Sequence, residues 1–154
     1  MRMYGAMMNG NTIILPIFIH VYFLGYVKNN LSNRAIELFH QIKRPDEIVT
    51  TILFNGCAQL ESQEALNLIK KISKTMPSSF RSNDQLVTSL FDALIKCGDP
   101  EYAEKLFSTM TKTVKSYGNL MNGFYENDNC IKVLDLYNQM KKISNQMKLS
   151  IYVF

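Results

Sequence analysis

The sequence has no tryptophan, only two histidines, His20 and His40, and three cysteines. The cysteines, Cys57, Cys97 and Cys130, are far apart and form no C-x-x-C pair, so they indicate neither a metal site nor a disulfide framework. Their odd number suits a reducing compartment. The chain also lacks a histidine flanked by paired carboxylates, a serine–histidine–aspartate set and a glycine-rich phosphate loop. We therefore expect no metal, no cofactor and no catalytic residue, and we expect that the protein is not an enzyme.

Strong charge is also missing. The net charge is +4, from 17 basic and 13 acidic residues, which is compatible with a polyanionic partner but does not indicate one. Hydrophobic residues make up 47% of the chain, as in a globular protein rather than a disordered one. The functional argument therefore depends on how these residues are ordered along the chain.

Residues 84–110 show the pattern most clearly. Leu86, Leu90 and Leu94 recur at helical spacing and give one apolar stripe. Gly98 follows where a helix would end in a left-handed residue, and Asp99 can cap a second helix with proline at its first position. Such a helix pair has an apolar face that it cannot bury alone, so it needs a neighbouring copy.

Copies are present. The second helix of each unit carries a small or β-branched residue followed three and four positions later by leucine and a bulky apolar residue. This core begins at Ala35, Ala65, Ala103 and Val133, with spacings of 30, 38 and 30 residues. Matching first-helix segments occur at residues 54–60, 91–98 and 121–127. A helix–turn–helix period in the low thirties predicts an all-α fold, an α-solenoid of about four repeats.

At these residues the chain resembles the pentatricopeptide repeat family. FDALIKCGDPEYAEKLFSTM, residues 91–110, is similar to the family's short repeat, and EIVTTILFNGCAQLESQEALNLIKKI, residues 47–72, is similar to its long repeat. Alternation of the spacing fits the mixed short-and-long subclass. The tetratricopeptide family is the nearest rival, but its first helix usually carries a tryptophan and its repeat length hardly varies. The resemblance implies a TPR-like superhelix that binds RNA.

The spacing divides the chain into four repeats and a tail. We expect a first repeat at residues 1–46, a long second repeat at 47–83, a short third repeat at 84–113, a fourth at 114–142, and a frayed tail at 143–154. Residues 4–10, YGAMMNG, match residues 117–123, YGNLMNG, so they are taken as part of the first helix of the first repeat. No polar cap is evident at either end, and we expect the chain to be a fragment.

Residues 11–25 break the pattern. Deleting these 15 residues aligns residues 4–35 with 117–133 without a gap. The segment is nearly all apolar, and three interpretations remain open: a signal or membrane anchor, an insertion that packs as an extra helix on the end of the solenoid, or translated intron or another gene-model artefact. We expect it to be dispensable and its deletion to stabilise the fold. His20 lies within it and is expected to have no ligand role.

The family resemblance also implies which residues would read RNA. Two positions per repeat carry the choice of base, one early in the first helix and one at the end of the repeat. The early positions are Gly5, Thr51, Thr88 and Gly118, and the late ones are Asp46, Asn83 and Thr113. Thr51 with Asn83 is similar to the family's adenine-type pair. Thr88 with Thr113 is not a standard pair, and the two glycines have no side chain with which to bond a base.

The resemblance further implies the partner and the place of action. We expect single-stranded RNA along the concave face, a role in RNA processing or stability, and location in a mitochondrion or other organelle, with no targeting peptide visible in the chain. DNA is not an expected partner, and a membrane is expected only if residues 11–25 are an anchor. The alternative function is a helical-repeat scaffold for a protein or peptide. Lys70, Lys71 and Lys74 do not decide between the two, because they lie on a second helix.

Overall fold

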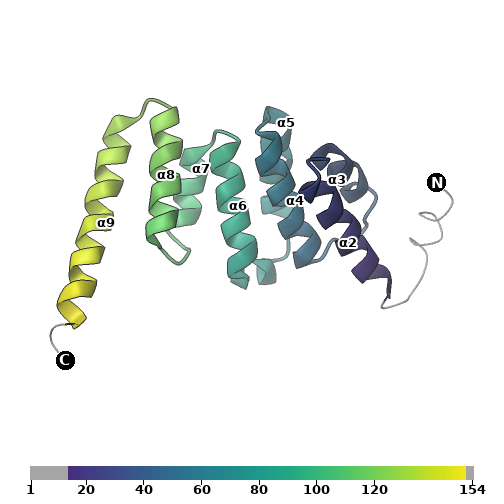
Figure 1. The fold of residues 1–154 in the computed structure, drawn as a ribbon, viewed down its shortest axis with the longest axis horizontal. Helices are drawn as coiled ribbons and strands as arrows, with labels where there is room; N and C mark the ends of the chain where they lie inside the picture. Colours follow the sequence, from purple (N-terminus) through teal and green to yellow (C-terminus); the bar gives the residue numbers. More distant parts are fainter. Residues whose placement is uncertain (1–13, 152–154) are drawn as a thin grey trace.

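A computed structural model describes the backbone of residues 14–151 and the side chains of residues 17–145, and these residues form α-helices without a strand. The helices stack in four antiparallel pairs along the long axis of the molecule (Figure 1). The pairs are α2 (Ile14–Lys28) with α3 (Ser32–Phe39), α4 (Glu47–Leu60) with α5 (Gln63–Thr75), α6 (Asp84–Lys96) with α7 (Pro100–Phe107), and α8 (Val114–Glu126) with α9 (Cys130–Ile151). A 3-10 turn, Ser78–Ser82, joins α5 to α6. The predicted α-solenoid is confirmed.

The turn within each pair has one design. Each first helix is followed, within two residues of its end, by a residue with positive φ. These residues are Asn30, Glu61, Gly98 and Asp128 in the four pairs. In three of them the next backbone N–H then bonds a carbonyl five residues back: Leu31 to Tyr26 (2.8 Å), Asp99 to Leu94 (2.9 Å) and Asn129 to Phe124 (2.9 Å). These bonds satisfy carbonyls that a helix end leaves free. The positive-φ residue therefore fixes a common numbering for the four first helices.

Helix α2 corrects the interpretation of residues 11–25. Residues 14–25 run without a break into residues 26–28, and together they form the first helix of the first pair. Phe23 and Val27 are buried there against Ala35 and Leu38 of α3 and against α4. Residues 14–25 are thus no interruption, and we now expect their deletion to destabilise the fold, because it would remove Phe23 from the core. Of the three interpretations, the one that expected a packed helix comes closest to the structure. However, α2 takes the place of the expected first helix and is not an additional one. Residues 4–10 lie outside the described residues.

The alignment on the other side of that segment was correct. Residues 26–35 match residues 124–133 in the structure as they do in the sequence, since Tyr26 and Phe124 accept the same turn bond. The expected fraying of residues 143–154 is wrong for residues 143–151, which continue α9. That stretch contains neither proline nor glycine, so nothing in it stops the helix. Within residues 14–151, no helix has the length and apolar character needed to cross a membrane.

Neighbouring first helices meet at small residues. A Cβ placed on Gly56 of α4 would lie 3.2 Å from Val27 of α2, and one on Gly123 of α8 would lie 2.9 Å from Ile95 of α6. Both glycines stand five residues before the positive-φ residue of their own helix, and their partners stand three before that of the preceding helix. This large-on-small contact sets the separation of successive pairs.

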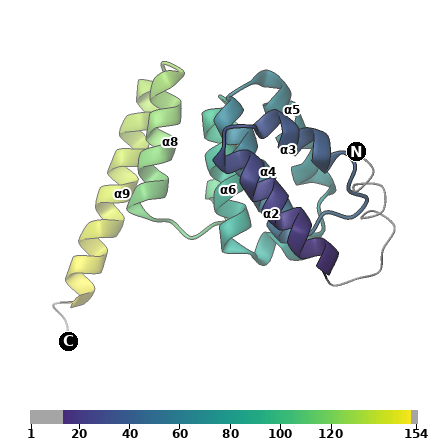
Figure 2. The same cartoon turned by 45° about the vertical axis from the view of Figure 1, so that its right-hand side comes forward.

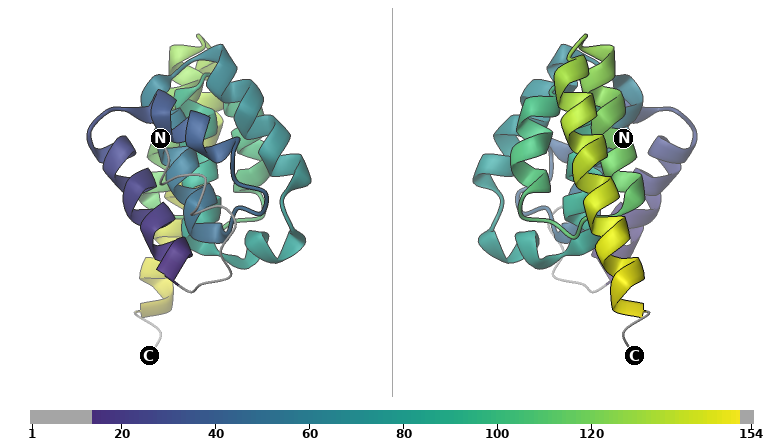
Figure 3. Two further views of the ribbon diagram at one scale, coloured as in Figure 1. Left: turned by 90° about the vertical axis from the view of Figure 1, so that its right-hand side faces the viewer. Right: turned by 90° about the vertical axis from the view of Figure 1, so that its left-hand side faces the viewer.

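The junctions are not equally close. Helix α4 packs extensively on α6, whereas α8 packs less extensively on α6 and follows α7 through a short link (Figure 2). End views show the first and second helices in two layers that run the length of the stack (Figure 3). The first helices form one layer, so residues at equivalent positions on them follow one another along the molecule.

Candidate nucleic-acid interface

The early positions of the repeats occupy one structural place. Thr51, Thr88 and Gly118 each lie ten residues before the positive-φ residue of their helix. In α2 the same count leads to His20, and not to Gly5, which lies outside the described residues. Four successive first helices therefore carry His20, Thr51, Thr88 and Gly118 at equivalent positions.

His20 is the residue that sequence reasoning missed. The apolar run around it gave no periodic contrast, because α2 is apolar on most of its surface, so it was taken for an insertion. A usable signal was present, since Asn29 and Asn30 mark a helix-ending turn. Counting back from that turn, as from Gly98 and Asp128, leads to His20.

The late positions are the N-caps of the next first helix. Asp46 Oδ1 accepts from the Val49 N–H (2.8 Å), and Asn83 Oδ1 accepts from the Leu86 N–H (3.1 Å). Thr113 Oγ1 accepts from the Ser116 N–H (3.1 Å), and Ser116 Oγ accepts from the Thr113 N–H (2.8 Å), which together form a capping box. Capping holds each late side chain at the start of the next first helix.

In the first pair, the early and late residues touch directly. His20 Nε2 lies 2.7 Å from Asp46 Oδ2, and since a carboxylate only accepts, the imidazole donates. The other carboxylate oxygen of Asp46 keeps the cap on α4. His20 is partly exposed and Asp46 is exposed, so both can be reached from solvent.

In the second pair, Glu47 connects the two residues. The Thr51 hydroxyl donates to the Glu47 backbone carbonyl (2.7 Å), and Asn83 Nδ2 donates to the Glu47 carboxylate (2.6 Å). Thr51 is buried and Asn83 is half-buried. The Thr51 hydrogen is thus used internally, and the amide of Asn83 has one donor and one acceptor already engaged.

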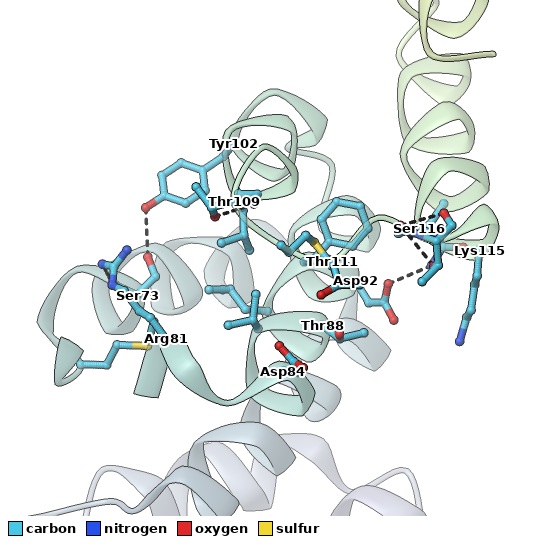
Figure 4. Close-up of a pocket in the computed structure, with 18 residues that line it drawn as sticks. Ser73, Arg81, Asp84, Thr88, Asp92, Tyr102, Thr109, Thr111, Lys115 and Ser116 are labelled. Carbon is cyan, nitrogen blue, oxygen red and sulfur yellow. Dashed lines mark hydrogen bonds between the residues drawn. The ribbon is translucent and has the colours of Figure 1, made fainter. Parts of the chain in front are cut away.

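In the third pair, Thr88 and Thr113 are both exposed and line one hollow of about 350 Å³ between α6, α7 and α8 (Figure 4). Arg81 and Lys115 stand at its rim, and the Arg81 guanidinium donates to the Ser73 carbonyl (3.2 Å). Asp84, Asp92 and Asn119 also line the hollow, and Asn119 Nδ2 donates to Asp92 Oδ1 (2.8 Å). The hollow combines cations, carboxylates and neutral donors, as a pocket for a polar ligand would.

The fourth pair contributes a backbone surface only. Gly118 is exposed, and a Cβ added there would meet no atom within 4 Å. No late residue follows it among the described residues, because α9 runs on as one helix. The structure therefore brings together three early–late pairs and leaves Gly118 alone.

Two lysines of the second helices are engaged in ion pairs away from this row. Lys70 of α5 forms an ion pair with Asp99 at the start of α7, and Lys132 of α9 bonds Glu104 of α7 (2.7 Å). Burial by itself would raise the pKa of Asp99, but bonds from Lys70 and from the Tyr102 N–H outweigh it and lower that pKa. The hydrogen bond to Glu104 raises the pKa of Lys132. These pairs bind successive second helices to each other.

The three cysteines differ in how deeply they are buried. Cys57 is buried, and burial raises the pKa of its thiol to about 12. Cys97 is half-buried and its Sγ donates to the Cys57 carbonyl (3.4 Å). Cys130 is exposed at the start of α9.

Comparison with known proteins gives a consistent result. The sequence model described as PPR repeat matches residues 23–44, 86–112 and 115–144, together about half of the chain. A mitochondrial pentatricopeptide repeat-containing protein of Arabidopsis thaliana is 27% identical over 123 residues, 77% of this chain and 18% of that protein. A chloroplastic one is 28% identical over 79% of the chain and 17% of its own length. A third is 33% identical over 66% of the chain and 13% of its own length. The chain thus spans less than a fifth of these relatives.

Proposed function

Because this chain belongs to the pentatricopeptide repeat family, we propose that it binds single-stranded RNA along the N-terminal halves of its first helices. One observation carries the proposal. The early and late residues of three successive pairs lie together at equivalent places, in direct contact, through Glu47, or around one hollow. A strand that follows this row would meet one early–late pair for each helix pair, which suits recognition of one base per repeat.

The side chains suggest how each pair would act. At Asn83 an amide offers both a donor and an acceptor, which is the combination that an adenine edge requires. At His20 an aromatic ring held by Asp46 offers a face for stacking as well as a hydrogen-bonding edge. At Thr88 and Thr113 two hydroxyls beside Lys115 would suit a base edge with a phosphate close by. Gly118 would tolerate any base.

The place of action follows from the relatives as a further proposal. Four relatives of 25–27% identity are named mitochondrial, and another is named chloroplastic. We infer that the protein acts on organellar transcripts, in their processing or stability. Measuring its import into isolated mitochondria and chloroplasts, with RNA recovered from each, tests this inference.

The binding experiment uses fluorescence anisotropy with a labelled single-stranded RNA at two salt concentrations. Binding should weaken steeply as salt rises, because lysine and arginine contacts release counterions from the phosphates. Unlabelled single-stranded RNA should compete well, while duplex RNA and single-stranded DNA should compete poorly. Equal competition by all three would reduce the proposal to nonspecific binding of a polyanion, and no binding at low salt would reject it.

A substitution tests the base choice without unfolding the helix. Asn83→Asp keeps the oxygen that caps α6 but loses the amide donor, so preference for adenine at that position should fall about tenfold or more. The new carboxylate faces Glu47, and Glu47→Gln added to it relieves that repulsion. Gln63→Glu, an exposed change on the second helix, is the control for altered charge. Unchanged preference in both Asn83 variants would contradict a reading role.

A further inference from the structure

A second hollow lies one junction earlier in the stack than the one that Thr88 lines. Its volume is about 440 Å³, and its walls come from the end of α3 and the link after it, from α4, and from α5 with the 3-10 turn that follows. We call it the α3–α5 hollow. On α4 it is lined by Thr50 and not by Thr51, so it lies beside the row of early and late residues and not on it.

The α3–α5 hollow lies inside the stack, at a place that another helix pair would not cover. The hollow at the next junction is lined by residues 73–119, so among the described helices neither the first pair nor α9 reaches it. A helix pair placed before α2 would be equally remote from the α3–α5 hollow. The opening is therefore a property of the junction between the first and second pairs.

The walls of the α3–α5 hollow are largely apolar. Ile72 is buried at the hollow, and five more apolar side chains that line it are half-buried: Phe39, Ile42, Leu68, Met76 and Phe80. Apolar surface that faces such a space gains free energy when an apolar molecule displaces the water. The volume lies within the range of roughly 300–1,000 Å³ that is typical of small-molecule sites.

The same walls offer little to a ligand with a polar body. The Thr50 hydroxyl donates to the backbone carbonyl four residues back (2.7 Å), and the Thr75 hydroxyl does the same (3.1 Å). Pro45 and Pro77 have no backbone N–H to donate. A nucleobase edge or a peptide backbone would lose its hydrogen bonds to water here and replace few of them, which is costly. These walls therefore favour a ligand whose body is apolar.

Charge determines the other half of the ligand. Arg44 and Lys71 both line the hollow, and no aspartate or glutamate is among its described lining residues. Within the part of the chain whose side chains are described, neither cation forms an ion pair, whereas the adjacent Lys70 pairs with Asp99. The hollow at Thr88, by contrast, has carboxylates beside its cations. The α3–α5 hollow thus has two cations available for an anion.

We propose that the α3–α5 hollow binds a small amphipathic anion that has a flexible apolar body and one carboxylate, as a fatty acid has. The Arg44 guanidinium can hold a carboxylate through two parallel hydrogen bonds, and Lys71 adds a second positive charge. The apolar body would cover Leu68, Met76 and Phe80, and the flexible thioether of Met76 suits an adaptable chain. This site is separate from the proposed RNA site and does not depend on it.

A tryptophan reporter provides the binding test. The chain has no tryptophan, so Phe80→Trp places a unique fluorophore in the wall of the hollow. Decanoate, held below the concentration at which it forms micelles, should shift the emission to the blue in a saturable way. Tyr137→Trp, at an exposed position on α9, is the control and should not respond. Decyltrimethylammonium has a similar tail with the opposite charge and should bind at least tenfold more weakly, and acetate, which lacks the tail, should not bind.

Matched substitutions test the two cations. Arg44→Gln and Lys71→Gln should each weaken decanoate binding about tenfold, measured by calorimetry on the otherwise unchanged chain. Lys43→Gln and Lys74→Gln remove exposed lysines close by in the sequence that do not line the hollow, and should leave binding unchanged. Equal losses in all four variants would reduce the effect to net charge and overturn the proposal. Failure of decanoate to bind the wild type saturably would also overturn it.

A filling substitution tests the apolar body. Thr75 is exposed and lines the hollow, so Thr75→Phe should occupy part of the space and weaken decanoate binding about tenfold. Ser79→Phe adds the same ring at an exposed position outside the lining and should not weaken it. Thermal unfolding of both variants checks that each still folds. Unchanged binding to a folded Thr75→Phe variant would place the anion elsewhere.

Competition with RNA distinguishes this site from the proposed RNA site. Excess single-stranded RNA should leave decanoate binding unchanged, since the α3–α5 hollow lies off the row that RNA would follow. Decanoate binding should likewise persist if the chain binds no RNA at all. Displacement of decanoate by RNA, with RNA affinity reduced in Arg44→Gln, would assign the hollow to RNA and overturn the proposal.

Discussion

The junction between α4 and α6 and the junction between α6 and α8 are built from equivalent positions, yet they differ in closeness. The first is packed along its length, whereas the second opens into the hollow that Thr88 and Thr113 line (Figures 2 and 4). Both retain the small residue at the closest approach, Ala93 in one and Gly123 in the other. The difference must therefore come from the neighbouring positions.

Polar residues account for it. Where α6 places Leu86 and the small Ser89 against its preceding pair, α8 places Ser116 and Asn119. Ser116 is used by the capping box with Thr113, and Asn119 bonds Asp92. Ser116 and Asn119 satisfy their hydrogen bonds while α6 and α8 remain apart. Apolar residues at these positions would bring the two helices closer, because burial of apolar surface drives close packing. A solenoid can thus tune one junction for openness while its neighbours remain packed.

The largest expected loss of stability comes from a comparison of an inner helix pair with an outer one. Ala103→Arg should destabilise the protein by about 3–5 kcal/mol, because Ala103 is fully buried where α7 meets α6 and the change overpacks that contact and buries a charge. Val133→Arg at the equivalent place in α9 should cost only about 1 kcal/mol, since Val133 is half-buried. Chemical denaturation measures both. Equal losses would show that the outer pair is held as tightly as the inner one.

The next test compares two leucines at the same position. Leu53 of α4 and Leu120 of α8 are both fully buried, eight residues before the positive-φ residue of their helix. Leu53→Ala should cost about 3–5 kcal/mol, and Leu120→Ala about 2–3 kcal/mol, since α4 is packed between two neighbours and cannot relax into the gap. Urea unfolding of both variants measures the two losses of stability. A larger loss at Leu120 would mean that the open junction contributes more than its packing suggests.

A third change attempts to close the hollow. Asp92→Leu with Asn119→Leu replaces a bonded polar pair by apolar side chains that can meet, and should raise stability by about 1–2 kcal/mol. Asn119→Leu alone is the control and should destabilise, because it leaves the Asp92 carboxylate without its donor. Thermal unfolding reports the difference. If the double variant is less stable than the wild type, the polar pair is not what keeps the junction open.

The smallest effect concerns pH. The pKa of Asp99 is lowered from its ordinary 3.8, so its ionised form adds stability above that value and loses it as the pH falls through the lower folded pKa. Asp99→Asn keeps the cap on α7 but loses the pair with Lys70, and should cost less than about 1 kcal/mol at pH 7 because the pair is partly solvated. The difference from the wild type should shrink below pH 3.8. A difference that stays constant from pH 7 to below pH 3.8 would contradict a contribution from this ion pair.

Much of the fold was predictable because each helix pair carries its own signals. Gly98, Asp99 and Pro100 mark a turn whose bonds the structure contains, and the core residues Ala35, Ala65 and Ala103 are buried as their spacing implied. The sequence failed at α2, where an apolar surface on nearly every side conceals the helical period. It failed again at residues 143–151, which continue α9 without a repeat to guide the assignment.

By itself, the sequence determined the number of helix pairs, the turns between them and the family to which they belong, since these depend on local spacing and capping. Only the tertiary structure decided which side chains meet between pairs. It brought together His20 and Asp46, which are 26 positions apart in the chain, placed Thr51 and Asn83 around Glu47, and opened the hollow at Thr88. Those contacts depend on how closely neighbouring first helices approach, and that distance is set by packing between residues far apart in the chain.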